Sequence, residues 1–441
     1  ACHKDEVQQS EETTQQTTTE TVETEEVTAE EPVMGNGETL TVMISSGDNE
    51  NSAITTALEK AAEILNVNIE YDVFPADQML NVVNTKLATG NAGDLLVHVF
   101  GLTDVSAKDL APLSGEWTEK IRSNVYPICV DQESGEVLKA PLGGSSNMGL
   151  VYNKTVLEQC GVTLPINNYA EFLEACEKIE VQGITPVYIS NKEVWTAQIL
   201  LLASMTSTIA ETPGLLTGIV TNEIKPYENE DLRKLWENVV GLKDLGYIND
   251  DYMSATNAMG FEAVANGTAA FYAHLDGSYG EIKAAYPDKI DDLGMMPCPM
   301  WDDEEMGYVL FGSASNYLSV VQNSENLELA KEFINVMLSE EVLMTYYELS
   351  PGAAPYFDLG FDLSISPFNK EMNDYAETMK VYGDFTNNIY EEGALMEPFY
   401  GRFNEQIQNL FSGLSVEEAM DDWYNAYAED AAARRVDGFV D

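Results

Sequence analysis

Aromatic side chains near predicted loops are the residues of this sequence best suited to a chemical task. Six of them adjoin turns or the ends of predicted elements: Trp117, Trp195, Tyr272, Tyr279, Trp301 and Tyr356. An aromatic face can stack on the C–H patches of a sugar ring, while neighbouring donors and acceptors pair with its hydroxyl groups. Each ring taken alone fits a hydrophobic core as well as a ligand contact.

Signatures of common enzyme classes are absent from the sequence. It contains no G-x-S-x-G, no H-E-x-x-H and no Walker A loop. The three histidines are His3, His98 and His274, so a Ser-His-Asp triad has few candidates. Carboxylates are too numerous for a glycosidase pair to stand out, since such a pair is defined by its separation in space. We therefore expect no catalytic residues.

Metal and disulfide chemistry also have little support. The run "WDDEEMG" at 301–307 offers carboxylates to Ca²⁺ but lacks EF-hand spacing, so a solvated charge run is the favoured interpretation. The five cysteines show no C-x-x-C spacing: Cys2, Cys129, Cys160, Cys176 and Cys298. Free buried thiols are favoured over a disulfide, although a Cys160–Cys176 pair stays open. We expect neither a metal nor a cofactor.

The charge balance excludes some partners. The chain has 75 acidic and 22 basic residues and a formal net charge of -53. This sign disfavours nucleic acid and makes polyanionic ligands and anionic membrane surfaces less favourable partners. A hydrophobic content of 44% supports a globular core, and 441 residues are typical of two or three domains.

The first 38 residues have a different character from the rest. Residues 3–38 are mostly Glu, Thr and Gln without aromatic side chains, which is typical of a disordered, extended segment. Cys2 therefore has no core to join. "AC" followed by a polar tether resembles mature bacterial lipoproteins, so we expect Cys2 to be acylated and to anchor the chain through lipid. The alternative is that Ala1 is a cloning remnant and Cys2 is incidental.

Strands and helices alternate through the first folded stretch. Hydrophobic periodicity predicts a strand at 39–47, a helix through 54–65 and a strand through 69–73. A helix from about 78, a glycine-rich break at 90–93 and a strand from 95 follow. This order is typical of an α/β fold with parallel pairing. The segment "DQESGEVLKAP" predicts a hairpin and then an extended stretch.

A second α/β unit is expected beyond Gly143, Gly144 and Gly149, which suggest an irregular crossing segment. The expected elements are helices at 154–160 and 169–180, a strand at 184–190, a helical region at 195–265, strands at 269–273 and 317–321, and one or two helices at 327–349. The apolar run from Ile199 is too short to span a bilayer and predicts a buried helix. The last hundred residues are expected to be mostly helical.

Four segments, in this order, resemble the extracellular solute-binding proteins of ABC importers, in the branch that mostly binds carbohydrates. They are "NTKLATGNAGDLLV", in which Gly93 replaces the usual proline, "GLVYNKTVLEQCGVTLPINNYAEFLEACEKIEVQGITPV", "FEAVANGTAAFYAHLDGSYGEI" and "ENLELAKEFINVMLSEEVLMTYYELSPGAAP". The resemblance covers essentially everything after Thr39.

The resemblance implies a two-lobe periplasmic-binding-protein-like fold with a hinge and a ligand cleft between the lobes. Beyond the tether at 1–38, it suggests an N-terminal lobe of 39–145 plus about 270–318. The C-terminal lobe would comprise about 150–266 plus about 322–441. Hinge crossings are expected near 143–150, 268–275 and 315–322.

The same resemblance implies where a ligand would bind. The matched positions are Ser46, Gly47, Asp48, His98, Phe100, Trp195, Asp276 and Tyr279, to which we add the aromatic Tyr356. Tyr279 stands where the family commonly has a sugar-stacking tryptophan. His98 fits a ligand contact and a satisfied buried imidazole equally. Asp94, Tyr152 and Asn153 are expected to maintain the fold.

The function implied is that of a monomeric, lipid-anchored receptor on the extracellular face of the cytoplasmic membrane. It would capture a carbohydrate, expected to be an oligosaccharide, and deliver it to the permease of an ABC transporter without chemistry. Two alternatives stay open. One is an extracellular glycan-acting enzyme or adhesin, and the other is a peptide or polyamine receptor of the same fold.

Overall fold

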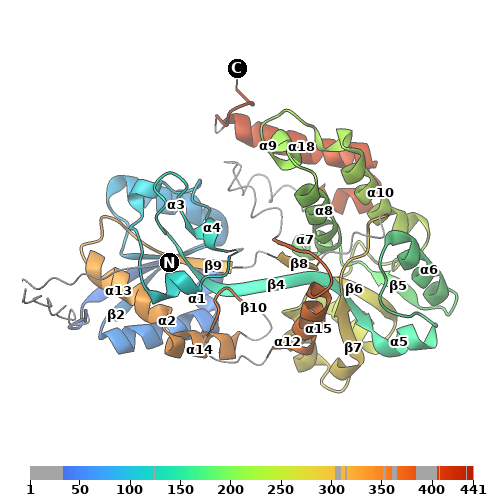
Figure 1. Cartoon of the computed structure of the whole chain (residues 1–441), viewed down its shortest axis with the longest axis horizontal. Helices are drawn as coiled ribbons and strands as arrows, with labels where there is room; N and C mark the ends of the chain where they lie inside the picture. The colour runs from blue at the N-terminus through green and yellow to red at the C-terminus, as the bar shows by residue number, and fades with distance from the viewer. Residues whose placement is uncertain are drawn as a thin grey trace, which may run out of the picture. The chain divides into compact units, whose positions relative to one another are not determined.

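The computed structural model describes residues 33–123, 125–302, 309–312, 315–350, 354–359, 365–383, 405–406, 408–433 and 435–440. Cys2, almost all of the expected tether, and residues 303–307 of the acidic run lie outside these residues. Residues 34–441 form one compact unit, whose elements are shown in Figure 1.

The elements of the described residues alternate as an α/β protein requires. The strands are β1 (Thr39–Ser45), β2 (Asn68–Phe74), β3 (Leu95–His98), β4 (Ala140–Asn153), β5 (Thr185–Tyr188), β6 (Ala269–Leu275), β7 (Leu293–Met296), β8 (Val309–Gly312), β9 (Ser315–Val320), β10 (Ala354–Pro355) and β11 (Val381–Gly383). The helices are α1 (Ser46–Glu50), α2 (Ser52–Leu65), α3 (Ala76–Thr89), α4 (Tyr126–Cys129), α5 (Lys154–Gln159), α6 (Tyr169–Glu180), α7 (Val194–Ala197), α8 (Ile199–Glu211), α9 (Leu215–Val220), α10 (Glu230–Asp244), α11 (Asn257–Asn266), α12 (Ser278–Ala285), α13 (Leu327–Met337), α14 (Glu340–Leu349), α15 (Pro367–Ala376) and α18 (Val416–Ala433).

The first part of the sheet has the parallel pairing expected from the sequence. β1 pairs in parallel with β2 and β3, while β9 returns antiparallel to β3 and to the first residues of β4. Local signals place the helix between β1 and β2. The Asn51 side chain caps α2 by accepting from the backbone of Ala53 and Ile54, and Asn66 ends it in the left-handed conformation.

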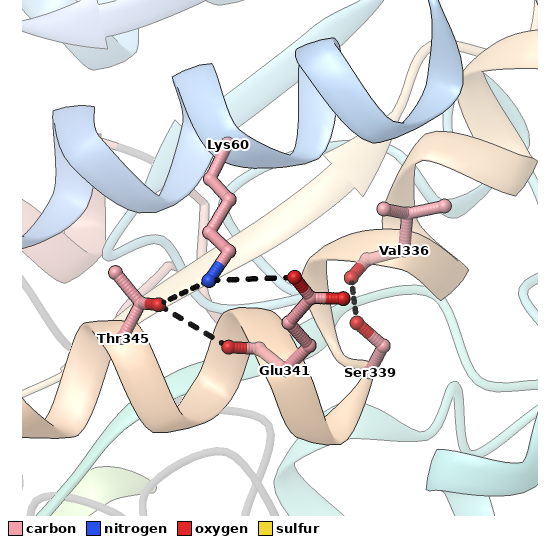
Figure 2. Close-up of polar contacts among 5 residues, drawn as sticks. All are labelled: Lys60, Val336, Ser339, Glu341 and Thr345. Carbon is pink, nitrogen blue, oxygen red and sulfur yellow. Dashed lines mark hydrogen bonds and ion pairs between the residues drawn. The ribbon is translucent and has the colours of Figure 1, made fainter.

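Helix α2 packs on α13 and α14 from the far end of the chain. Its apolar stripe, including Ile54, Leu58 and Leu65, is buried in a core shared with Phe333 and Val342, and each such side chain stabilises the fold by roughly 1.5–3 kcal/mol. A polar contact borders this core. Lys60 Nζ lies 2.8 Å from Thr345 Oγ1 and 3.6 Å from Glu341 Oε1, the contacts drawn as dashed lines in Figure 2.

Strand β4 links the two parts of the molecule. It runs for 14 residues and pairs with β9 at 140–143, β10 at 144–145, β8 at 146–148, and β6 and β7 at 148–153 (Figure 1). The prediction of an irregular segment at its glycines was therefore wrong. Gly143 has a φ of +113°, and a Cβ on Gly149 would lie 2.3 Å from the Met296 carbonyl oxygen. Both glycines allow backbone geometry that a side chain would hinder.

The second part has its own hydrophobic cores. β5 and β6 are parallel, and β6 and β7 flank the end of β4. Helix α8 is buried from Ile199 to Ile209, as its apolar sequence predicts. No helix among the described residues is both long and apolar enough to cross a membrane.

The cores group two segments differently from the expected lobes. Residues 269–301 pack with 148–266, because β6 pairs with β5 and with the end of β4 rather than joining β1–β3. The helices at 327–349 pack with residues 40–142, because their apolar side chains share a core with the apolar stripe of α2. Cys129, Cys160, Cys176 and Cys298 are free and buried, which confirms the prediction of free thiols.

Candidate functional site

Two polar clusters flank the middle of β4. Asn316 on β9 lies opposite Leu142, and Asp276, just after β6, is bonded to Asn147. Leu142 and Asn147 are five residues apart, which corresponds to about 16 Å along a strand. The predicted positions 46–48, which lie in α1, are thus near β9, whereas 276–279, the turn after β6 and the start of α12, adjoin β4.

The first cluster follows β1. The Ser45 hydroxyl accepts from Asp48 N at 3.1 Å, while the Asp48 carboxyl is hydrogen-bonded to the Asn316 side chain. Burial raises the pKa of the Asp48 carboxyl, while hydrogen bonds to the side chains of Ser45 and Asn316 act in the opposite direction. Ser46 Oγ donates to the Phe74 carbonyl at 3.1 Å, and Gly47 is exposed with open space around it. Asp48 and Gly47 are the members best placed to meet a ligand.

His98 is satisfied within the protein. Phe100 N donates to its Nδ1 at 3.0 Å, which leaves the proton on Nε2 to be donated to Ser319 Oγ at 2.8 Å; Ser319 in turn donates to the Leu138 carbonyl. Burial, with a smaller contribution from the positive charge of Lys139, holds the pKa of His98 well below its usual range. This arrangement matches a satisfied buried imidazole, because neither ring nitrogen remains for a ligand.

Lys139 supports the same region and was not singled out from the sequence. Its side chain is fully buried, and Nζ donates to the Phe100 carbonyl at 2.9 Å. Burial lowers the pKa of this amine to about 8. A single lysine within the apolar stretch "EVLKAPL" is the signal that could have identified it. Phe100, which Lys139 holds, is itself almost completely buried.

The second cluster is centred on Asp276, which has no exposed surface. Its carboxylate accepts from Asn147 N at 3.1 Å, Asn147 Nδ2 at 2.9 Å and Asn369 Nδ2 at 2.8 Å. Burial raises the pKa of this carboxyl to about 7, while the hydrogen bonds act in the opposite direction. The structure therefore places Asp276 within the protein, holding β4 and α15, rather than facing a ligand.

Tyr279 is the second residue of α12, just after the turn that contains Asp276, and is half-buried. Its ring meets the buried Phe368 ring edge to face, with centroids 5.2 Å apart and an angle of 80° between the planes. Ser278 beside it is buried, and its hydroxyl oxygen has no hydrogen-bond partner. This segment combines an aromatic ring with an unpaired polar group.

A third group follows β5. Ser190 Oγ lies 2.7 Å from the Tyr272 hydroxyl, which donates to Asn257 Oδ1, and His274 Nε2 reaches the same oxygen at 2.9 Å. This network fixes the start of the loop that leads into α7. Asn191 in that loop is buried, yet neither its Oδ1 nor its Nδ2 has a partner. Trp195 lies in α7, but its side chain is outside the described part.

Four of the six candidate aromatic residues fill the cores: Trp117, Tyr272, Trp301 and Tyr356. The Trp117 indole donates to Asn335 Oδ1 at 2.9 Å, and that of Trp301 donates to the Ser204 carbonyl at 3.1 Å. The core interpretation therefore applies to both tryptophans. Tyr356 lies in the core that contains α2, α13 and α14, and not at a surface that a ligand could reach.

The residues expected to maintain the fold do so. The Asp94 carboxylate accepts from Thr41 N at 2.8 Å and from the side chains of Ser324 and Asn326, which joins β1 to the segment after β9. Asn153 caps α5 through Val156 N and donates to the Val264 carbonyl. Tyr152 donates to the Glu371 carboxylate.

The sequence did not single out Asn147, Asn191, Ser278 or Asn316. Each has a buried side-chain atom without a hydrogen-bond partner, and leaving such an atom unpaired costs about 1–3 kcal/mol. Asn and Ser at the ends of predicted strands were the available signal. Among the described residues, no group of three or more His, Cys, Asp and Glu side chains could hold a metal.

Comparison with protein families identifies the class of protein. Residues 46–344 match the family described as bacterial extracellular solute-binding protein. The chain belongs to this family. The predicted resemblance is confirmed, and membership implies a solute-binding receptor in an extracellular or periplasmic location.

Solved structures show the same two-lobe fold, as predicted. A chitin oligosaccharide binding protein superposes with a TM-score of 0.71 at 17% identity, covering 90% of this chain and 99% of that one. A sugar transporter from Bacillus licheniformis in complex with stachyose superposes with a TM-score of 0.67 at 18% identity, covering 88% of this chain and 99% of that one. A binding protein of an ABC transporter from Bifidobacterium animalis subsp. lactis, in complex with mannobiose, superposes with a TM-score of 0.63 at 16% identity. The match covers 89% of this chain and 94% of that one. No curated protein sequence matches significantly.

Proposed function

We propose that this chain is the substrate-binding protein of an ABC importer and captures an extracellular oligosaccharide. The observation that carries the proposal is a set of buried amide and hydroxyl groups that, within the described part of a solute-binding family member, have a side-chain atom without a partner: Asn147 on β4, Asn316 on β9, Ser278 at the start of α12 and Asn191 after β5. These groups are neutral donors and acceptors, which suits a ligand rich in hydroxyl groups better than a charged ligand. A buried group left unpaired favours any ligand or water that pairs with it.

Relatives of known structure support the ligand class. Their bound or named ligands include chitin oligosaccharide, stachyose, mannobiose and raffinose. Tyr279 and Trp195 would supply the aromatic surfaces on which such sugars stack. We assign the direct contacts to Gly47, Asp48, Asn191, Trp195 and Tyr279.

Ligand capture would proceed by closure of the lobes about β4. The Tyr347 hydroxyl donates to the Gly143 carbonyl, and β10 pairs with residues 144–145, so this stretch of β4 is held from the N-terminal side. A sugar that contacts both clusters binds the closed form more tightly and shifts the population toward it. The closed form would then dock on the permease and release the sugar unchanged.

We further propose that Cys2 is acylated and anchors the chain. It would hold a monomeric receptor on the extracellular face of the cytoplasmic membrane, with residues 3–38 as its tether. Mass spectrometry of the protein isolated from a bacterium that expresses its precursor tests this directly. An unmodified Cys2 would refute the anchor without affecting the proposed ligand.

Thermal unfolding with a ligand panel tests the function. Monosaccharides, oligosaccharides, peptides and polyamines are each added to the full chain, and a ligand at a hundred times its Kd raises stability by about 2.7 kcal/mol. A rise in Tm with one class of oligosaccharide is the expected result. A response to peptides or polyamines alone would overturn the ligand class, and hydrolysis of an oligosaccharide would overturn the non-enzymatic role.

A further inference from the structure

The segment from Asp276 to Tyr279, which comprises the turn after β6 and the first two residues of α12, is supported by two consecutive residues of α15. Asn369 Nδ2 donates to the Asp276 carboxylate at 2.8 Å, and Phe368 packs edge to face against the Tyr279 ring. The segment is also joined to β4, since Asp276 N donates to the Asn147 carbonyl at 3.0 Å while Asn147 N returns a bond to the carboxylate. The turn after β6 and the first residues of α12 are thus fixed by the same helix.

We propose that Asp276 and Phe368 are positioning residues for Tyr279: they hold its ring at the angle needed to stack on a sugar, without contacting the sugar themselves. This inference rests on the proposed function, because it takes Tyr279 as a ligand contact. Phe368 and Asp276 have no exposed surface, whereas Tyr279 is half-buried. The geometry therefore separates a buried support from an accessible ring.

The charge of Asp276 matters to this support. The N–H groups of Asn147, Asn369 and Gly277 all point at its oxygens. An ionised carboxylate accepts all of them, but a protonated one must turn its own hydrogen toward a donor and lose a bond. Because burial raises the pKa of Asp276 to about 7, the acid form is populated below neutral pH, and the segment loosens there.

Stability and affinity should consequently change in opposite directions with pH. The pKa of Asp276 is raised in the folded protein, so the folded state binds more protons than the unfolded chain between about pH 4 and 7. The stability contributed by this group therefore falls as pH rises through that range, whereas the ordering of Tyr279 improves. A general loss of stability would instead lower the free energy of unfolding and the sugar affinity together.

Other titratable groups lie on the elements around Asp276. They are Tyr152 on β4, Tyr272 and His274 on β6, Tyr279, Glu281 and Lys283 on α12, and Lys370, Glu371, Asp374 and Tyr375 on α15. Burial holds the pKa of His274 at about 4, so this ring stays neutral from pH 5.5 to 8. Glu371 is engaged by Tyr152 and by Met295 N.

Asp94 provides a matched control. It is a buried carboxylate that accepts from a backbone N–H and two side chains, like Asp276, but it joins β1 to the segment after β9. Asp94→Asn should lower Tm without changing the Tyr279 segment. A sugar-affinity loss of equal size in both variants would show that Asp276 acts only through global stability.

The experiment compares the full-length wild type, Asp276→Asn and Asp94→Asn by calorimetric titration from pH 5.5 to 8. The probes are stachyose, raffinose, mannobiose and chitobiose. The expected wild-type Kd is about fivefold weaker at pH 5.5 than at pH 8, a change of the size of one hydrogen bond. Asp276→Asn should bind about fivefold to tenfold more weakly at pH 8 and show no pH dependence. Wild-type affinity with a wild-type pH profile in Asp276→Asn would overturn the proposal.

Hydrogen exchange of the ligand-free proteins tests the positioning role of Asp276 even if none of the four sugars binds. Peptides covering 276–285 should exchange about fivefold faster in Asp276→Asn than in the wild type or Asp94→Asn. Unchanged exchange in this segment would overturn the positioning role, whereas silence of all four sugars would count only against the proposed ligand. If Asp276→Asn does not fold, Phe368→Leu provides the test: it should weaken sugar binding and speed exchange while retaining the wild-type pH profile.

Discussion

The Lys139 ammonium lies 3.7 Å from the centre of the Tyr317 ring. Both residues are buried, and the ammonium also donates to the Phe100 carbonyl. A desolvated cation over an aromatic face is stabilised by about 2 kcal/mol, which offsets part of the cost of burying the charge. One buried lysine thus connects β9 and the start of β4 to the segment after β3.

This burial predicts that stability increases with pH above about 8. The pKa of Lys139 is lowered to about 8 in the folded protein, so between this value and the ordinary lysine pKa the unfolded chain binds more protons. The free energy of unfolding should rise at up to about 1.4 kcal/mol per pH unit from this group. Urea unfolding of the wild type and Lys139→Met from pH 7.5 to 9.5 measures this pH dependence of the free energy of unfolding. Lys139→Met should lack the rise, and the exposed Lys108→Met should retain it.

Substitution of Asn191 should weaken ligand binding without lowering the stability of the fold. Its amide is buried without partners, so Asn191→Ala should leave the free energy of unfolding unchanged or raise it by up to about 1 kcal/mol. Because we assign this amide to the ligand, the same change should weaken oligosaccharide binding by about tenfold. Chemical denaturation and calorimetric titration measure the two effects.

Asn153 is the control for this variant, since its amide makes two hydrogen bonds, one of which caps α5. Asn153→Ala should destabilise the fold by about 1–3 kcal/mol and leave the affinity of the folded protein unchanged. A clear destabilisation by Asn191→Ala would show that its amide is paired in solution, and would remove it from the site.

The local part of the fold could be predicted from the sequence. The stripe of Ile54, Leu58 and Leu65, together with the turn residues around them, specified α2 and its neighbouring strands through short-range interactions. β4 was missed because its glycines suggested an irregular segment, whereas its regularity comes from partners between 269 and 355. The packing of 269–301 with 148–266 could not be read locally either, because pairing with β5 is a long-range property.

The ligand-binding role of the candidate residues stays a prediction. Resemblance led to residues 46–48 and 276–279, and the structure places Asp48 beside Asn316 on β9 and Asp276 beside Asn147 on β4. The roles of His98 and Asp276 depend on which donors surround them, and Ser319 and Asn369 are distant in the sequence. The unpaired amide of Asn191 likewise depends on which residues the fold brings around it, and no local pattern reveals that.

Gly149 should not tolerate even a methyl group. A Cβ at this position would lie 2.3 Å from the Met296 carbonyl oxygen, a backbone atom of the neighbouring β7. Gly149→Ala should destabilise the protein by about 1–3 kcal/mol, because β4 and β7 must separate to accept it. Thermal unfolding measures the loss, with Gly47→Ala as control, since a Cβ on Gly47 would have no atom within 4 Å. Equal Tm values for the two variants would contradict the close approach of these strands.

The aromatic residues proposed for sugar stacking give the most direct test of the site. Tyr279→Ala and Trp195→Ala should each weaken oligosaccharide binding by about twofold to tenfold, which is the contribution of a stacked aromatic pair. Tyr279→Phe should bind as the wild type does, because the ring face makes the contact. The exposed Tyr126 lies on α4, outside both clusters, and Tyr126→Ala serves as the control for loss of a surface ring. Tm values near that of the wild type would show that all four variants are folded. Unchanged affinity in both Tyr279→Ala and Trp195→Ala would move the ligand away from these two aromatic residues and contradict the proposed site.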